Sequence, residues 1–148
     1  MKKIFPILLL MAVFSACQGP MGPEGPPGDS TQWAVRTITV HTNEWMLSGR
    51  PNELGSYYYA DKSIPELTAF VFNEGAVIGY IRTGDNVKNI LPYVLHKGEV
   101  GATGEYLWTQ TYDFDFSPGA VRFYVTFSDF MTGSARPGTE TYDIVLIW

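Results

Sequence analysis

The chain has 148 residues, with 15 acidic and 10 basic side chains, one cysteine, 15 glycines and 10 prolines. This length corresponds to one domain. Charged residues make up 17% of the chain and hydrophobic residues 45%, which excludes a disordered acidic polypeptide and a multi-span membrane protein. Loss of Lys2 and Lys3 with a signal peptide leaves 8 bases against 15 acids, a net charge of −7. Nucleic acid is therefore not an expected partner.

The first sixteen residues have the layout of a secretory signal peptide. Two lysines give a positive start, and the apolar run 4–14 is 11 residues long and ends at the small pair Ser15-Ala16. A membrane-spanning helix needs about 20 apolar residues, so this run is too short to span the membrane. We expect residues 1–16 to be removed, so that the mature chain begins at Cys17.

Cys17 is the only cysteine and directly follows Phe14-Ser15-Ala16. This placement resembles the lipobox of bacterial lipoproteins, in which Phe14 replaces the usual aliphatic residue. The resemblance implies that the thiol of Cys17 carries a diacylglycerol and that its amino group is acylated, for example with palmitate. Two acyl chains suffice for stable attachment to a membrane. The alternative is a plain secreted protein with an incidental Cys17. Without further cysteines, the domain cannot form disulfides, thiolate nucleophiles or Cys-based zinc sites.

Residues 17–31 are predicted to be the lipidated cysteine and a collagen-like linker. Glycine occupies every third position in the tract GPMGPEGPPGDS, from Gly19 to Ser30. This period and the prolines are typical of polyproline II, which at about 3.1 Å per residue gives a stalk of roughly 35 Å. Four triplets offer little contact area to offset the entropy of ordering three chains, so we expect a monomeric stalk. Weak homo-association through the tract is the alternative.

The order of these segments is similar to that of bacterial envelope lipoproteins with a collagen-like leader. A lipobox cysteine is followed at once by a GPx tract and then by 117 residues rich in predicted strands, Gln32 to Trp148. The resemblance covers nearly the whole chain. It implies a lipid-anchored protein of the bacterial cell envelope, with the outer membrane as the expected site and the domain in the periplasm or outside the cell. It implies no particular activity.

Residues 32–148 consist of short apolar or alternating runs separated by turn residues, which is typical of an all-β domain. Nine such runs in this length predict a two-sheet antiparallel β-sandwich of about 8–9 strands, Ig-like or jelly-roll-like. The predicted strands are Trp33–Val40, Glu44–Leu47, Ser56–Ala60, Leu67–Asn73, Ala76–Thr83, Val87–Lys97, Glu105–Phe116, Ala120–Phe130 and Thr141–Trp148.

The clearest alternation is in Glu105–Phe116, where one face is expected to be core and the other solvent. The predicted core face carries Tyr106, Trp108, Tyr112, Phe114 and Phe116. We expect this strand to pair with Ala120–Phe130 around the turn Ser117-Pro118-Gly119.

Three further patterns predict local structure. Pro92 removes a ladder donor, so Val87–Lys97 is expected to be an edge strand or to contain a bulge. Asn73-Glu74-Gly75 predicts a hairpin loop with Gly75 in the left-handed region. The nearly unbroken apolar run Tyr142–Trp148 predicts a central strand covered on both sides.

No catalytic motif is present, and we expect neither an enzyme nor a cofactor. His41 and His96 lie at predicted strand ends without a partner motif, and an isolated histidine lacks the group that sets its tautomer. Asp113 and Asp115 share one strand face, and a calcium site there would need further oxygens from a loop such as 84–86. We favour the alternative that these carboxylates keep a wet face from pairing with another sheet.

The aromatic residues give the best functional indication. Trp45, Tyr57, Tyr58 and Tyr59 lie in a weakly patterned region, and three successive tyrosines cannot all point into one core. Outward aromatic rings can stack on sugars or anchor protein partners, although the same residues can simply fill a core that has no cysteine. We therefore predict a non-catalytic binding module for glycan or protein. The alternative is a structural component of the envelope or of a membrane protein complex.

Overall fold

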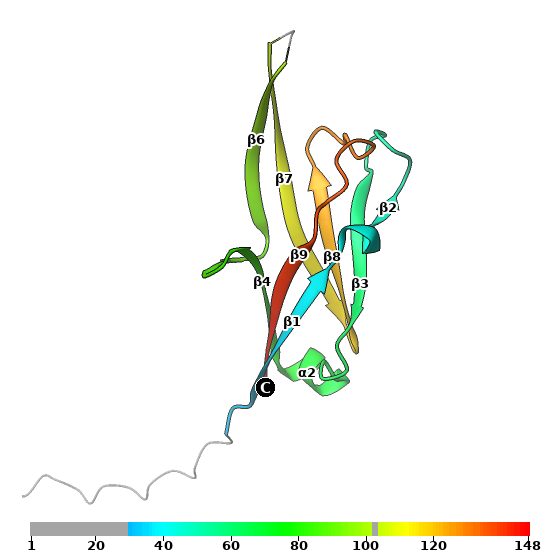
Figure 1. Ribbon diagram of the computed structural model, residues 1–148. Coiled ribbons are helices and arrows are strands. Elements are labelled where there is room, and N and C mark those ends of the chain that lie inside the picture. Colours follow the sequence, from blue (N-terminus) through cyan, green and yellow to red (C-terminus); the bar gives the residue numbers. More distant parts are fainter. Residues whose placement is uncertain (1–29, 102–103) are drawn as a thin grey trace, which may run out of the picture. The chain divides into compact units, whose positions relative to one another are not determined.

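The computed structural model describes residues 30–101 and 104–148. The predictions for the signal peptide, for Cys17 and for the collagen-like tract up to Asp29 lie outside the described residues. A compact unit runs from Thr31 to Trp148 and contains two antiparallel sheets of four and five strands (Figure 1). The predicted all-β sandwich is therefore confirmed. Within the described residues, no helix combines the length and hydrophobicity needed to cross a membrane.

The four-stranded sheet has the order β1-β9-β4-β5. Its strands are β1 (Trp33–Val40), β9 (Glu140–Ile147), β4 (Ala76–Gly84) and β5 (Val87–Ile90). The last strand of the chain thus lies between β1 and β4, as its apolar sequence predicted. Tyr142, Ile144 and Leu146 are fully buried on its inner face. Its outer face is only partly covered, because Val145 and Ile147 are half-buried, so the prediction of cover on both sides is corrected.

The five-stranded sheet has the order β2-β3-β8-β7-β6. Its strands are β2 (Met46–Ser48), β3 (Tyr57–Ser63), β8 (Ala120–Phe127), β7 (Gly104–Ser117) and β6 (Tyr93–Gly101). A short 3-10 helix, η1 (Thr42–Glu44), precedes β2 where the sequence predicted the start of a strand. In Figure 1 the β6–β7 hairpin extends well beyond the other strands.

The predicted pairing of β7 with β8 is confirmed. Phe116 opposes Val121 and Ser117 opposes Ala120 in the register, with Pro118 and Gly119 between them. Gly119 has φ of +82°, the left-handed region that glycine tolerates without a Cβ penalty.

The segment around Pro92 forms two edge strands, where the sequence predicted one edge strand or a bulged strand. β5 is the edge of the four-stranded sheet and β6 is the edge of the five-stranded sheet. Pro92 lies between them, so it withdraws no donor from either ladder. The chain crosses from one sheet to the other at this point.

The predicted strand Leu67–Asn73 is wrong, because residues Ala69–Glu74 form helix α2. The hydroxyl of Thr68 accepts a hydrogen bond from the Val71 N–H at 3.2 Å, which caps the helix. Gly75 ends the helix with φ of −99°, so the predicted left-handed hairpin glycine is also corrected. A local cap here overrides the strand that the short apolar run predicted.

The core lies between the two sheets and is rich in aromatic rings. Phe123 of β8 stacks on Tyr142 of β9 with ring centroids 4.0 Å apart and an interplanar angle of 15°, and both side chains are 0% exposed. Phe114 of β7 lies against the backbone of Gly79 in β4, where a Cβ atom would approach the ring within 2.5 Å. The ring of Phe114 therefore fits against the opposing sheet because Gly79 has no side chain.

We predict that Gly79→Ala lowers the free energy of unfolding by about 1–3 kcal/mol, because the added methyl group forces the Phe114 ring out of its position. Urea denaturation monitored by circular dichroism measures the change. Gly138→Ala is the matched control, because a Cβ there meets nothing within 4 Å and the variant should unfold like the wild type. Equal stability of the two variants would contradict this account of the sheet contact.

Candidate functional site: an aromatic groove beside the β6–β7 hairpin

Two of the four aromatic residues singled out in the sequence belong to the core. Trp45 is 1% exposed, and its Nε1–H donates to the Gly138 carbonyl at 2.9 Å. Tyr58 is 4% exposed, and its hydroxyl donates to the Thr132 carbonyl at 2.6 Å. Because both rings are covered and both polar groups have partners, neither residue offers a surface for ligand stacking. The prediction is corrected at these two positions.

Tyr57 and Tyr59 point away from the core, as the run of three tyrosines required. They join Tyr124 of β8 on the outer face of the five-stranded sheet, with the Tyr57 centroid 6.3 Å from Tyr59 and 5.7 Å from Tyr124. The guanidinium of Arg122 lies 4.6 Å from the Tyr59 centroid and pairs with Asp61 through two hydrogen bonds of 2.5 and 2.8 Å. These side chains hold one another across a flat sheet face.

The ends of this tyrosine cluster also have polar partners. The hydroxyl of Tyr124 donates to Asp115, and burial together with this hydrogen bond raises the pKa of Tyr124 to about 12. Asp113 accepts a hydrogen bond from the Phe114 N–H. Asp113 and Asp115 lie on the five-stranded sheet, whereas the 84–86 turn that was considered as a further oxygen source joins β4 to β5 of the other sheet. Among the described residues, no three metal-ligating side chains form a cluster.

A concave aromatic surface lies on the inner face of the β6–β7 hairpin. Tyr106 and Trp108 continue the face of β7 that also carries Tyr112 and Phe114, as the alternation predicted. Their rings form an offset stack with centroids 5.7 Å apart and an interplanar angle of 29°. Trp108 packs against the core, but Tyr106 is 47% exposed because the four-stranded sheet does not reach it. The predicted core face therefore becomes the wall of a groove at this end.

The outer compartment of this aromatic groove has a volume of about 380 Å³. Its lining includes Glu99, Tyr106, Trp108, Phe127, Asp129 and Met131. The carboxylate of Asp129 is fixed from two sides, by the Tyr106 hydroxyl at 2.5 Å and by the Met131 N–H at 3.1 Å. The hydrogen bond to this carboxylate raises the pKa of Tyr106. Glu99 of β6 lies directly across the ladder from Tyr106.

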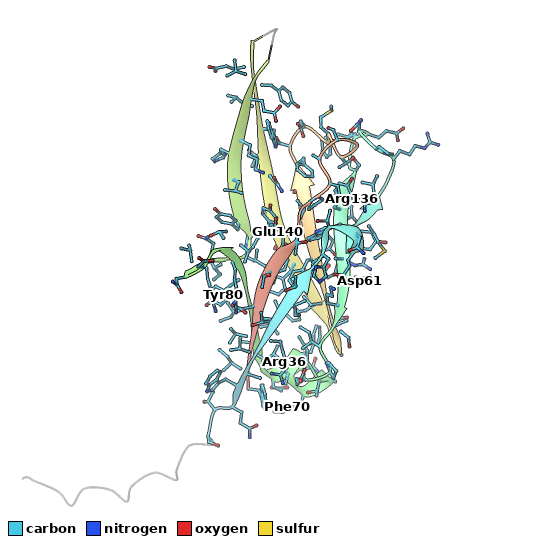
Figure 2. All side chains as sticks on the ribbon, in the orientation of Figure 1. Arg36, Asp61, Phe70, Tyr80, Arg136 and Glu140 are labelled. Carbon is cyan, nitrogen blue, oxygen red and sulfur yellow. The ribbon has the colours of Figure 1, made fainter. Side chains whose placement is uncertain are left out.

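The inner compartment has a volume of about 230 Å³ and shares Trp108 and Phe127 with the outer one. Its polar lining consists of Lys97, Gln110, Tyr112, Arg136 and Glu140. Arg136 and Glu140 are labelled in Figure 2, on the segment that precedes β9 and at its first residue.

A chain of hydrogen bonds crosses the floor of the inner compartment. Gln110 Nε2 donates to the Tyr112 hydroxyl at 2.8 Å, and that hydroxyl donates to Glu140 Oε1 at 3.1 Å. Burial raises the pKa of Glu140, and the hydrogen bond from Tyr112 partly offsets this effect. Burial also raises the pKa of Tyr112, with a smaller contribution from the charge of Glu140. The floor is thus a fixed polar network beneath an aromatic wall.

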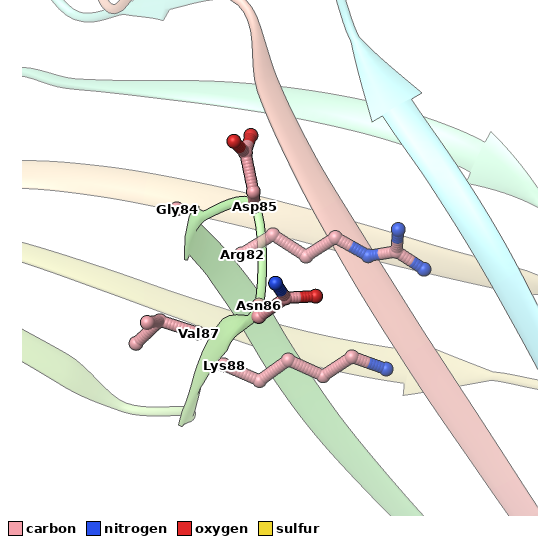
Figure 3. A pocket seen from close by; sticks show the side chains of 6 residues that line it. All are labelled: Arg82, Gly84, Asp85, Asn86, Val87 and Lys88. Carbon is pink, nitrogen blue, oxygen red and sulfur yellow. The ribbon is translucent and has the colours of Figure 1, made fainter.

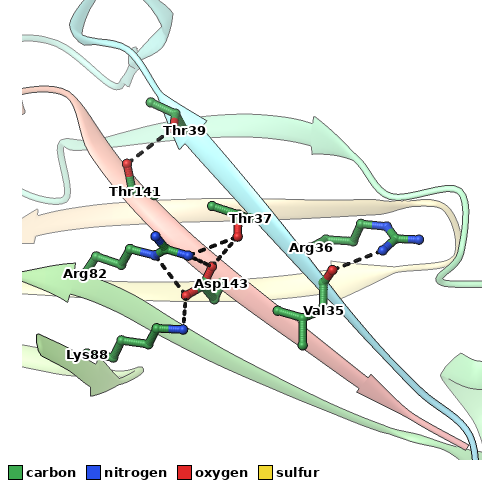
Figure 4. Close-up of polar contacts among 8 residues, drawn as sticks. All are labelled: Val35, Arg36, Thr37, Thr39, Arg82, Lys88, Thr141 and Asp143. Carbon is green, nitrogen blue, oxygen red and sulfur yellow. Dashed lines mark hydrogen bonds and ion pairs between the residues drawn. The ribbon is translucent and has the colours of Figure 1, made fainter. Parts of the chain in front are cut away.

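A second hollow, of about 310 Å³, lies at the turn between β4 and β5 (Figure 3). Arg82 and Lys88 extend from it side by side, but both cations already pair with Asp143 of β9 (Figure 4). Asp143 is 1% exposed and accepts hydrogen bonds from Arg82 at 2.7 and 3.0 Å and from the Thr37 hydroxyl at 2.6 Å. The Arg82 guanidinium, together with Lys88 and Thr37, holds the pKa of Asp143 well below its usual range. This hollow is therefore the rim of an ion cluster in which both cations already share one buried carboxylate.

The two histidines lie on different elements. His41 precedes η1, and its backbone N–H donates to Glu44 Oε2 at 2.7 Å. His96 is in β6, with Nδ1 3.3 Å from the Thr109 hydroxyl. His96 therefore lies within a strand and not at a strand end as predicted, and the expectation that neither histidine acts as a base stays a prediction.

The aromatic groove was missed as a site by sequence reasoning. Its aromatic residues were assigned to the core because alternation shows which face a side chain occupies but not how far the opposing sheet extends. The one available signal was the length of the predicted alternating strand Glu105–Phe116, which has 12 residues against eight in Thr141–Trp148. Comparison with known proteins assigns no function to the groove. The chain matches no protein family model, no curated protein and no solved structure.

The ion cluster around Asp143 generates a prediction about stability. Asp143→Asn should lower the free energy of unfolding at pH 7 by about 2 kcal/mol, because two cations lose a buried counter-charge. The folded-state pKa of Asp143 is lowered, so its contribution is present above the ordinary carboxyl pKa and is lost as the pH falls. The difference between wild type and variant should therefore narrow below about pH 4.

Urea denaturation at a series of pH values measures this difference. Asp61→Asn is the control, because the Asp61–Arg122 pair is exposed and should contribute less than about 1 kcal/mol. A difference for Asp143→Asn that stays constant from pH 7 to pH 3 would disprove the charged-pair explanation.

Proposed function

We propose that this protein is a lipid-anchored envelope protein that displays a non-catalytic β-sandwich and binds a glycan chain in the aromatic groove. The observation that supports the proposal is the half-exposed Tyr106 ring, stacked on Trp108 at the wall of a concave surface with a polar floor. The C–H faces of a sugar pack on aromatic rings, and its hydroxyl groups need hydrogen-bonding partners close by. The groove offers both within one continuous surface.

The position of the groove supports display on a tether. The described chain enters the sandwich at Gln32, whose N–H and carbonyl both pair with Trp148 at 2.6 and 2.9 Å. The groove lies near Glu140, at the opposite end of β9. Eight residues of strand separate the two ends by about 25 Å. A ligand in the groove is thus remote from the point at which the linker joins the domain.

The anchor in this proposal is Cys17, acylated as the lipobox resemblance implies. We therefore propose that the protein is located in the bacterial cell envelope, at the outer membrane. The domain would then face the periplasm or the exterior. The glycine- and proline-rich tract serves in this proposal as a monomeric stalk between the lipid and the domain, with weak association of copies through the tract as the alternative.

One observation favours a second function, that of a structural envelope component. The outer face of the four-stranded sheet carries two apolar rows near the start of β1. Trp33 is aligned with Ile147 and Ala76, and Val35 with Val145 and Ile78. Trp33 is 70% exposed and Val35 is 38% exposed. Such a face suits contact with another protein of a membrane complex.

Glycan binding is tested with an array of immobilised neutral, acidic and amino-sugar oligosaccharides, followed by calorimetry with the glycan that is retained. Tyr106→Ala should weaken binding about tenfold, because a ring contact of this kind contributes roughly 1 kcal/mol or more. Tyr106→Phe should retain most of the affinity, because it keeps the ring.

The matched control for this experiment is Leu107→Ala. Leu107 is 72% exposed and neighbours Tyr106, but it lies on the opposite face of β7, so its loss should leave binding unchanged. Equal loss in the two variants, or no retained glycan with the wild type, would count against the groove. If the wild type retains no glycan, the apolar face of the four-stranded sheet remains as the candidate surface for contact with another protein.

Lipidation is tested separately in a bacterial host that is fed an alkyne analogue of palmitate. The wild-type protein should be labelled and should sediment with membranes, whereas Cys17→Ala should be unlabelled and should remain in the soluble fraction, because the attachment site is gone. Ser15→Ala, which leaves the thiol in place, is the control and should be labelled like the wild type. A wild-type chain that stays soluble and unlabelled would refute the anchor.

A further inference from the structure

The outer compartment of the aromatic groove has an uneven distribution of charge. Two carboxylates line it, Glu99 on β6 and Asp129 after β8, and no lysine or arginine of the described residues does. The Tyr106 hydroxyl and the Met131 N–H fix the carboxylate of Asp129. Glu99 forms no ion pair with a described residue within 4.0 Å. A ligand group placed here therefore meets negative charge on two sides.

The aromatic wall attracts cations, as the carboxylates do. The π-face of a tyrosine or tryptophan ring carries a negative quadrupole and attracts a cation within about 6 Å of its centroid. The ring of Tyr106 lies between the two carboxylates, since Glu99 opposes it in the ladder and Asp129 accepts a hydrogen bond from its hydroxyl. Aromatic faces combined with carboxylates form a site for a cation attached to an apolar body.

The inner compartment has the opposite character on its rim. Lys97 precedes Glu99 by two residues on the same face of β6, and it opposes Trp108 in the ladder. Arg136 lies with its guanidinium 5.8 Å from the Tyr58 centroid. The inner compartment thus has two cations and one carboxylate, Glu140, in its lining. The remaining positive charge repels a cationic ligand group. A cationic ligand group is directed to the outer compartment, about 7 Å away along β6.

We propose that the aromatic groove selects glycans that carry protonated amino groups, with one amine seated against Tyr106 between Glu99 and Asp129. This inference rests on the proposed glycan-binding function and specifies its ligand. The sugar ring next to the amine packs on the Tyr106–Trp108 stack, and its hydroxyl groups face the Gln110–Tyr112–Glu140 network. N-acetylation of the amine removes the charge and with it the contribution of the two carboxylates.

The test compares two probes with the same sugar backbone, of which one has free amines that carry this charge and the other has N-acetyl groups that do not. They are a tetramer of β-1,4-linked glucosamine and the same tetramer fully N-acetylated, titrated by calorimetry at pH 6 into the detergent-solubilised full-length protein. The amino form should bind about tenfold more tightly, which corresponds to roughly 1.4 kcal/mol from the cation–π contact and the carboxylates together.

Two variants locate the origin of this preference. Glu99→Gln and Asp129→Asn should each reduce the ratio of the two affinities by about threefold, as expected for loss of one partly exposed charge. Glu105→Gln is the matched control. It removes the same charge from the neighbouring residue of Tyr106, but on the opposite face of β7, and should leave the ratio unchanged. Because Asp129 also orders its loop, Glu99→Gln is the decisive variant, and thermal unfolding confirms that each variant is folded.

The outcomes separate this inference from the function on which it rests. Equal affinity for the two tetramers, with both weakened by Tyr106→Ala, would overturn the amine preference and leave glycan binding intact. A preference that survives Glu99→Gln and Asp129→Asn together would also overturn it. Failure of the glucosamine tetramer to bind would reject the inference, and failure of every glycan on the array would reject the proposed function as well.

Discussion

The length of the β6–β7 hairpin, which extends beyond the strands of the opposing sheet (Figure 1), determines where this domain has a core and where it has a surface. β7 has 14 residues with aromatic side chains repeating on one face, whereas β9, which supplies the centre of the opposing sheet, has eight. Over the shared length, rings from the two sheets pack against each other, as Phe123 and Tyr142 do at 4.0 Å. Beyond Glu140 the same face of β7 has no opposing strand, and Tyr106 is left half-exposed. One continuous alternating pattern thus produces both the core and the aromatic groove.

Much of the fold could be predicted from the sequence, because the strands depend on local alternation and on turn residues. The β7–β8 hairpin, the edge character of the segment around Pro92 and the central place of the last strand all follow from such patterns. The failures have local physical causes. Thr68 caps a helix where an apolar run predicted a strand, and Arg82 and Lys88 shield Asp143 on a face that was expected to be covered by another layer. Neither interaction is visible as a periodicity.

The candidate site was much less predictable. Three successive tyrosines required an outward ring, and Tyr57 and Tyr59 do face outward, but they are locked with Tyr124 and Arg122 on a flat surface. Trp45 lies in the same stretch of chain and is buried, because its indole N–H finds a carbonyl in a loop that precedes β9. The groove depends on contacts between residues distant in sequence, such as Tyr106 with Asp129 and Tyr112 with Glu140. These contacts could not be predicted because the partners are far apart in the sequence. The residue types themselves are common in binding sites.

The pairing of Gln32 with Trp148 has a mechanical consequence. The backbone that leads into the domain continues directly into β1, which is hydrogen-bonded to β9 through eight successive residue pairs from Trp33–Ile147 to Val40–Glu140. A pulling force that is applied at residue 31 and opposed at the far end of β9 acts along the axis of β1. The hydrogen bonds of this ladder then share the load in shear, and they do not break one after another as in unzipping. The strand order therefore places the full β1–β9 ladder under shear when the domain is pulled from residue 31.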